Sequence, residues 1–264
     1  MAQITLQGIL FDAKSSFLRG PALAPPLIRK AYHSHSANYY AEDGKKITPE
    51  MFDDKGDFEI ENYFDIEKTT SKNLKKGTPL LTFGGDHSVT FPLIKAFYSV
   101  YGKLDILHID AHGDLYSSFE GDKHSHACPF YNIMENELAE NLVQVGIRTL
   151  NEEQRQHAQR FGVKINEMKD FASFSMPQFT NPLYLSLDMD ALDPAFAPGV
   201  SHHEPGGLST RQIIELIQDI RVPLVGADIV EYNPTRDIND MTAMVCAKLF
   251  REIAAKMMYP IRPG

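Results

Sequence analysis

Short apolar runs alternate with longer segments of mixed polarity along most of this chain. Runs with the length and composition of buried strands lie at 4–11, 79–83, 104–109, 142–147, 182–187 and 223–230. Segments with helical patterning lie between or after them, at 25–32, 88–101, 151–161, 209–220 and 239–258. Residues 36–72 are polar and weakly periodic, so we expect mostly irregular structure there. The alternation predicts the α/β class, with a parallel sheet covered by helices on both faces.

Local signals support the helix boundaries and a single unit. Pro25 and Pro26 suit the first turn of a helix, and Ser209 is a suitable N-cap for the helix that follows it. The sequence has no internal repeat, linker or shift in composition that would divide it. We therefore expect one domain over residues 1–264.

Acidic residues and histidines follow several of the predicted strands. The clusters are Gly-Gly-Asp-His at 84–87, Asp-Ala-His-Gly-Asp at 110–114 and Asp-Met-Asp at 188–190. Side chains two residues apart on extended backbone point the same way, which groups Asp110 with His112 and Asp114, and Asp188 with Asp190. The carboxyl ends of parallel strands form the usual ligand site of an open α/β sheet. The residues at or just after such ends are His87, Asp110, Asp188 and Glu231.

Four carboxylates in one place require a cation. Each close pair of like charges repels by roughly 4 kcal/mol at a near-surface effective dielectric. Six oxygen and nitrogen ligands also exceed what one small divalent ion takes from protein, so two ions that share bridging carboxylates fit better. Turn and capping aspartates would explain any one of the clusters, but not all three together. The pattern therefore predicts a binuclear metallohydrolase.

Composition narrows the class of protein further. The net charge of −9 argues against a nucleic-acid-binding or anionic-membrane surface, since both require basic patches. Cys128 and Cys246 are isolated, which suits a reducing compartment. No apolar run is long enough to span a membrane, and the start of the sequence has no secretory pattern. We expect a soluble, cytoplasmic protein.

The chain resembles the ureohydrolase superfamily of arginases, agmatinases and formiminoglutamases. The resemblance rests on the stretches 84–88, 110–114 and 186–194. Four further stretches, at 15–21, 124–128, 145–148 and 198–208, make it most similar to plant-type arginases. The resemblance implies a three-layer α/β/α fold with a mostly parallel sheet, two Mn²⁺ ions per chain, and assembly into trimers or hexamers.

The resemblance also assigns roles to individual residues. It implies that His87, Asp110, Asp114 and Asp188 hold one ion, and that Asp110, His112, Asp188 and Asp190 hold the other. Asp110 and Asp188 would then bridge the two ions. It further implies that Asp114 accepts a proton, that Glu231 pairs with the substrate guanidinium, and that His126 shuttles protons.

The expected substrate is L-arginine, hydrolysed to L-ornithine and urea. Agmatine is the main alternative, and formiminoglutamate and free guanidine are less favoured. Animal-type arginases have Asn at the position of Tyr116 and Asp at the position of Asn151. These differences put in doubt whether this chain binds the α-amino acid group of arginine as the animal enzymes do. We expect His126, Asn151, His202 and Glu231 to contact the substrate. A catalytically silent oligomeric binding protein is the alternative from another class.

Two residues near the motifs receive other interpretations. His108 lies within an apolar strand and is expected to be a packed core histidine. His124 could line the entrance to the site or help to engage a substrate carboxylate.

Overall fold

All strands of the central sheet run parallel. A computed structural model of the chain describes residues 3–36 and 38–259. In sequence order the strands are β1 (Ile4–Leu10), β2 (Phe52–Glu59), β3 (Leu80–Phe83), β4 (Leu104–Ile109), β5 (Ala139–Ile147), β6 (Lys164–Glu167), β7 (Leu183–Asp188) and β8 (Leu224–Val230). Their order across the sheet is β2-β1-β3-β8-β7-β4-β5-β6. Parallel pairing joins every neighbouring pair.

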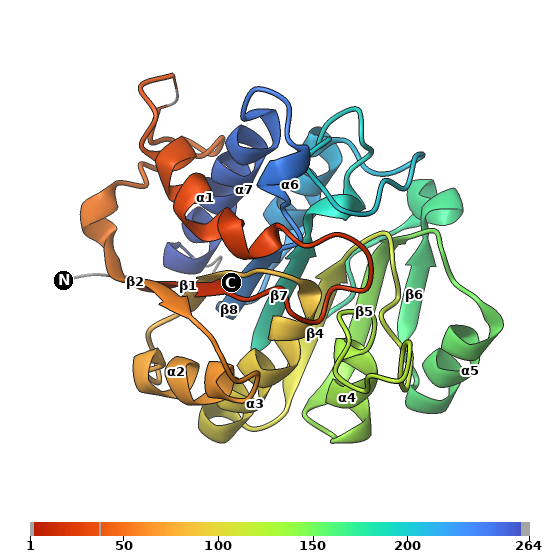
Figure 1. Cartoon of the computed structure of the whole chain (residues 1–264). Helices are drawn as coiled ribbons and strands as arrows, with labels where there is room; N and C mark the ends of the chain where they lie inside the picture. The colour runs from red at the N-terminus through yellow and green to blue at the C-terminus, as the bar shows by residue number, and fades with distance from the viewer. Residues whose placement is uncertain (1–2, 37, 260–264) are drawn as a thin grey trace.

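Helices cover both faces of the sheet (Figure 1). They are α1 (Ala24–Tyr32), α2 (Asp65–Asn73), α3 (Thr90–Tyr101), α4 (Pro129–Glu135), α5 (Glu152–Phe161), α6 (Thr210–Asp219) and α7 (Met241–Met258). On one face α7 packs between α1 and α6, and on the other α2, α3, α4 and α5 lie in a row. Each layer has its own hydrophobic core against the sheet. The three-layer α/β/α prediction is confirmed.

The buried elements were predicted well and the edges poorly. The predicted strands at 4–11, 79–83, 104–109, 142–147, 182–187 and 223–230 all form, with small differences at their ends. Ser209 caps α6 in a capping box with Gln212, as the sequence predicts for the N-cap.

The expectation of mostly irregular structure over 36–72 is wrong, because β2 and α2 lie within this segment. β2 is an edge strand that pairs only with β1 and keeps much of its surface in water, so it lacks an apolar run. α2 buries only Ile66 and Thr70, which is too few residues to create a helical period. α4 and the four-residue edge strand β6 were also missed.

The strand order places the acidic clusters next to one another. β3, β8, β7 and β4 are consecutive neighbours in the sheet. His87, Glu231, Asp188 and Asp110 lie at or just beyond the carboxyl ends of these four strands, in that order. Four motifs that are far apart in the sequence therefore meet at one edge of the sheet.

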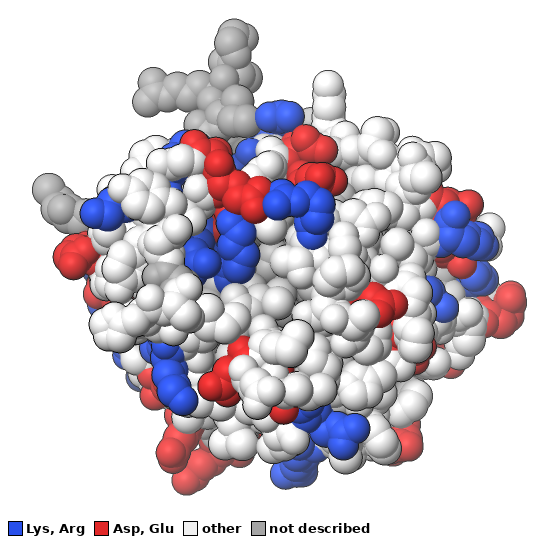
Figure 2. Space-filling view, turned by 90° about the horizontal axis from the view of Figure 1, so that it is seen from above, with Lys and Arg blue, Asp and Glu red and all other residues white. Residues whose placement is uncertain are grey.

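The surface is mixed in charge. Figure 2 looks onto the side covered by α1, α6 and α7, where acidic and basic side chains lie side by side among neutral ones. Arg211, on α6, pairs with Glu42. None of the described helices has both the length and the hydropathy that a membrane crossing requires.

Candidate metal centre

The predicted ligands meet in a buried cluster at the carboxyl edge of the sheet. His87, Asp110, Asp188 and Asp190 are almost fully buried, and Asp114 nearly so. His112 is the most accessible of the six, with a side chain 25% exposed. Asp188 ends β7, and the others lie in turns directly after β3, β4 and β7. The positions predicted from sequence spacing are therefore close in space.

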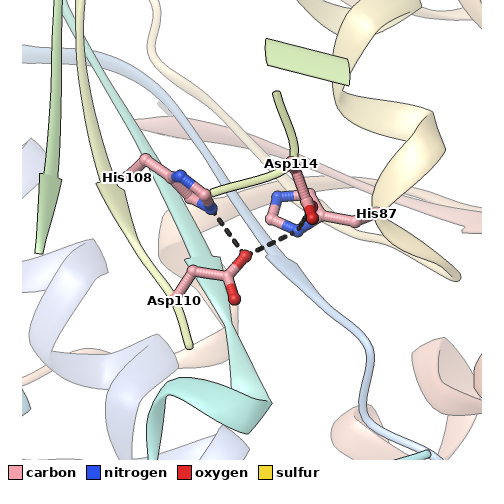
Figure 3. Close-up of side chains that lie close together, drawn as sticks. All are labelled: His87, His108, Asp110 and Asp114. Carbon is pink, nitrogen blue, oxygen red and sulfur yellow. Dashed lines mark hydrogen bonds and ion pairs between the residues drawn. The ribbon is translucent and has the colours of Figure 1, made fainter. Parts of the chain in front are cut away.

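Three carboxylates surround one nitrogen of His87 (Figure 3 shows two of them, with His108). Nδ1 of His87 lies 3.1 Å from Asp110 Oδ2, 3.2 Å from Asp114 Oδ2 and 3.0 Å from Asp188 Oδ2. The directions are wrong for hydrogen bonds, and this buried nitrogen has no hydrogen-bond partner. One nitrogen and three oxygens therefore point toward a common space.

The other side of the ring determines where the proton lies. Nε2 of His87 is 3.0 Å from Ser186 Oγ, and this hydroxyl donates to Asp228 Oδ1 at 2.7 Å. Because the Ser186 proton is used by Asp228, its oxygen accepts the proton of His87 Nε2. Nδ1 then presents a lone pair to three carboxylates, an arrangement that is unfavourable without a cation. The site fits a bound metal ion.

A second ligand group adjoins the first. Nδ1 of His112 lies 3.1 Å from Asp190 Oδ2 and 3.4 Å from Asp110 Oδ1. Asp110 therefore faces His87 with one oxygen and His112 with the other, as a bridging carboxylate would. Asp188 Oδ1 accepts a hydrogen bond from the Asp190 amide at 2.7 Å, which fixes its orientation.

Like charges crowd this cluster. Burial, followed by the charges of Asp190 and Asp110, raises the pKa of Asp188 well above its ordinary value. Burial disfavours a charged His87, but the nearby carboxylates of Asp110, Asp114 and Asp188 outweigh it and raise the pKa of His87 well above its usual range. Both directions show a site with an excess of negative charge that a cation would relieve.

His108 is more than the packed core histidine that we expected. It is fully buried and stacks on Phe130 with ring centroids 3.8 Å apart, but its Nε2 lies 2.7 Å from Asp110 Oδ2. Gln144 Nε2 donates to Gly113 O at 2.6 Å and lies 3.0 Å from His108 Nδ1. Nδ1 therefore accepts, so Nε2 carries the proton and donates it to Asp110. The hydrogen bond orients a predicted metal ligand.

His126 and Glu231 form a pair beside the metal cluster. His126 Nδ1 lies 3.0 Å from Glu231 Oε1, which also accepts from the His87 amide at 2.9 Å. On the opposite side of the ring, the Ser16 amide donates to Nε2 at 3.2 Å. Glu231 has a φ of 61° and Asp114 a φ of 49°, in the left-handed region that non-glycine residues seldom adopt. Such backbone conformations concentrate at functional sites.

A cavity of about 220 Å³ opens onto these groups. His112, Asp114, Asp188, Asp190, His126 and Glu231 line its inner part. The outer part carries Ser16, Tyr116, Phe119, Ala127, Thr149, Gln154, His202 and Glu204. No lysine or arginine lines the cavity within the described part of the chain.

Two residues expected near a substrate have other contacts. Asn151 is the N-cap of α5, where its side chain accepts from the Gln154 amide and donates to Tyr116 Oη at 2.9 Å. It does not line the cavity, so its contact with substrate stays a prediction. His124 packs against Phe91 and Tyr63, away from the cavity lining.

Sequence reasoning missed Ser16, Gln144 and Glu204. Ser16 and Glu204 belong to the loops at 15–21 and 198–208 that carried the family resemblance, but nothing in their residue types indicates a site. Gln144 lies within a buried strand, where a polar residue at 0% exposure is itself a signal that it serves a neighbour.

Comparisons with known proteins agree with this geometry. Residues 2–255 match the family model described as the Arginase family. Arginase 1, mitochondrial, from Arabidopsis thaliana is 44% identical and the match covers 97% of this chain and 81% of that protein. The solved arginase from Medicago truncatula superposes with a TM-score of 0.91 at 41% identity, covering 97% of this chain and 87% of that one. The agmatine ureohydrolase of Thermoplasma volcanium has a TM-score of 0.86 at 31% identity, covering 97% and 90%.

Proposed function

Since the chain belongs to the arginase family, we propose that it hydrolyses the guanidinium group of L-arginine to give L-ornithine and urea. The main support is the buried ligand cluster at the ends of β3, β7 and β4, together with Glu231 and His126 beside it. Similarity to plant arginases over almost the whole chain favours arginine among the guanidino substrates.

The cofactor that we propose is a pair of Mn²⁺ ions. His87, Asp110, Asp114 and Asp188 would hold the first ion, and Asp110, His112, Asp188 and Asp190 the second. Carboxylate and imidazole ligands suit Mn²⁺, and two bound ions would lower the pKa of a water molecule and so supply the nucleophile near neutral pH. His108 would hold Asp110 in the orientation that bridging requires.

Glu231 would position the guanidinium. Both hydrogen bonds described for its carboxylate end on Oε1, so Oε2 is left for the N–H groups of the substrate. An ion pair with a planar guanidinium fixes both its distance and its plane. The left-handed backbone at Glu231 turns this side chain into the cavity instead of continuing β8.

His126 and Asp114 would handle protons. Burial opposes a charge on His126, but the hydrogen bond to Glu231 outweighs it and raises the pKa of His126 to about 9. A protonated His126 can give up a proton as the leaving nitrogen departs, and Asp114 can accept one from the attacking water through a carboxylate oxygen. Because the Ser16 amide donates a hydrogen bond to His126 Nε2, it disfavours a proton on that nitrogen. It therefore favours the neutral form of His126 once the proton has been transferred.

Three further proposals come from the sequence and its family resemblance. We propose that residues 1–264 act as one domain, that copies assemble into a trimer or hexamer, and that the protein works in the cytoplasm. The relative from Arabidopsis thaliana is named as mitochondrial.

Agmatine is the second candidate substrate. Among the described residues, the cavity wall has no lysine or arginine to bind the α-carboxylate of arginine, and agmatine differs from arginine by the loss of that group. The structural similarity to an agmatine ureohydrolase points the same way.

The test is urea release by the Mn²⁺-treated protein, with L-arginine and agmatine compared side by side. Urea from arginine supports the proposal, and urea from agmatine alone would show that agmatine is the substrate instead. No urea from either, in protein that binds Mn²⁺, would contradict the activity and favour the silent binding protein.

A further inference from the structure

Glu204 is the one carboxylate on the outer part of the cavity among the described residues. It lies in the loop between β7 and α6, and its side chain is 39% exposed. Its Oε1 is 3.8 Å from Nε2 of His112, the ring nitrogen that faces away from Asp190. Glu204 therefore lies outside the ligand cluster, on the side of the His112 ring that faces the cavity mouth.

Arg148 holds the backbone at this position. Its guanidinium donates to Glu204 O through Nε at 3.0 Å and also through Nη2. The same guanidinium contacts the carbonyl oxygens of Gly146, Asp190, Ala191 and Leu192. The loop is therefore tied to the turn after β7, and the charge of Arg148 is satisfied by carbonyl groups away from the cavity.

The charges of the outer wall favour a cation. Apart from Glu204, its side chains are hydroxyls, an amide, the imidazole of His202 and the apolar groups of Phe119 and Ala127. A substrate that extends outward from Glu231 thus meets a single charged group, and this group is negative.

We propose that Glu204 binds the ammonium group at the far end of the substrate. This inference rests on the proposed function, because L-arginine and agmatine both carry an ammonium group several bonds from the guanidinium. Glu204 would then select guanidino compounds with an amine-bearing tail over those with an apolar or purely anionic tail. It would do so without distinguishing arginine from agmatine.

A different role for Glu204 predicts different results. A metal-ligating histidine commonly donates its second N–H to a carboxylate, and Glu204 is the carboxylate nearest to His112 Nε2. The separation of 3.8 Å is too long for a hydrogen bond. If Glu204 nevertheless supported His112, its loss would weaken Mn²⁺ binding and would affect every substrate alike.

The experiment compares wild type, Glu204→Gln and Glu153→Gln, all saturated with Mn²⁺. Glu153 is a matched control, because it lies on the neighbouring helix α5, pairs weakly with Ser117 and does not line the cavity. The ligands are L-arginine, agmatine and butylguanidine, which has the guanidinium and chain but no ammonium. Butylguanidine is measured as a competing ligand, so it need not be turned over.

Glu204→Gln is expected to raise the KM for arginine and agmatine by roughly 10- to 100-fold, as for loss of a hydrogen bond to a charged group. Its kcat, its Mn²⁺ content and its affinity for butylguanidine should stay within about twofold of wild type, and Glu153→Gln should match wild type throughout. An unchanged KM in active Glu204→Gln would overturn the inference, as would an equal loss of affinity for butylguanidine. Absence of urea in the wild type would instead contradict the proposed function.

Discussion

The inner and outer walls of the cavity are built in different ways. The inner wall consists of His112, Asp114, Asp188, Asp190, His126 and Glu231. Most of them are buried at or after strand ends, and His126 pairs with Glu231 as His112 does with Asp190. The outer wall consists of Ser16, Tyr116, Phe119, Ala127, Thr149, Gln154, His202 and Glu204, which lie on loops or a helix start and, except for Gln154, are partly exposed. The inner wall is therefore positioned by the sheet, and we expect it to determine the reaction. The outer wall is positioned by loops, and we expect it to determine the choice of substrate.

The inner wall should be far less tolerant of substitution. Asp110→Asn removes a negative charge that faces both ligand groups, and we expect it to abolish tight Mn²⁺ binding. Turnover should fall by about 10³-fold or more, since the ions supply several kcal/mol of transition-state stabilisation. Metal analysis of the dialysed protein and a urea assay measure the two effects.

Asp105→Asn is the matched control for this prediction. Asp105 is a buried carboxylate on the same strand, β4, where it accepts hydrogen bonds from Asn141, Thr180 and Asn181 at the end opposite the cluster. The variant should be less stable but should keep its Mn²⁺. If Asp110→Asn retained full metal content, the bridging role of Asp110 would be refuted.

The sequence predicted the metal-ligand part of the inner wall because its signals are local, whereas the role of His126 came from the family resemblance. Asp110, His112 and Asp114 follow a buried strand at spacings that bring them to one face, and a parallel sheet delivers strand ends to one edge. The order of β3, β8, β7 and β4 in the sheet is not local information, so their adjacency came only from the structure.

The outer wall could not be predicted in the same way. Ser16 reaches His126 from 110 residues away along the chain, and Glu204 depends on how Arg148 holds its loop. Such contacts depend on loop conformation and leave no periodic pattern. The edge elements β2 and α2 were missed for a related reason, because they bury too little apolar surface to create one.

The pair of His126 and Glu231 in the inner wall should make stability depend on pH. The pKa of His126 is about 9 in the folded protein and close to 6.5 when unfolded, so its stabilisation is complete below pH 6.5 and is lost as the pH rises through 9. The difference in unfolding free energy between wild type and His126→Asn should fall by roughly 3 kcal/mol over this interval. Urea unfolding of the metal-free proteins at several pH values measures it. A constant difference would show that His126 gains no charge on folding.

Loss of His108, which orients a predicted metal ligand, should reduce activity less than loss of a ligand itself. His108→Ala removes the donor to Asp110 Oδ2, and we expect Mn²⁺ affinity to fall by about 10- to 100-fold. Turnover should largely recover at saturating Mn²⁺, because every proposed ligand is still present. His157→Ala is the control, since His157 contacts Leu115 O on the side of α5 and lies outside the cluster. If the affinity for Mn²⁺ were equal in the two variants, His108 would be only a packed core residue.

The smallest effect on activity is expected from substitution of Asn151, which tests whether this residue belongs to the substrate site. Asn151→Ala removes the N-cap of α5 and should cost about 1 kcal/mol of stability. Asn151→Ser keeps a capping oxygen but is too short to reach Tyr116 Oη, so it separates capping from other roles. If Asn151 touches the substrate, both variants should raise KM, and if it acts only as a cap, Asn151→Ser should match wild type in both KM and melting temperature. A match between Asn151→Ser and wild type would contradict the substrate contact predicted from the sequence. The substrate site would then extend along α5 only to Gln154, which lines the cavity.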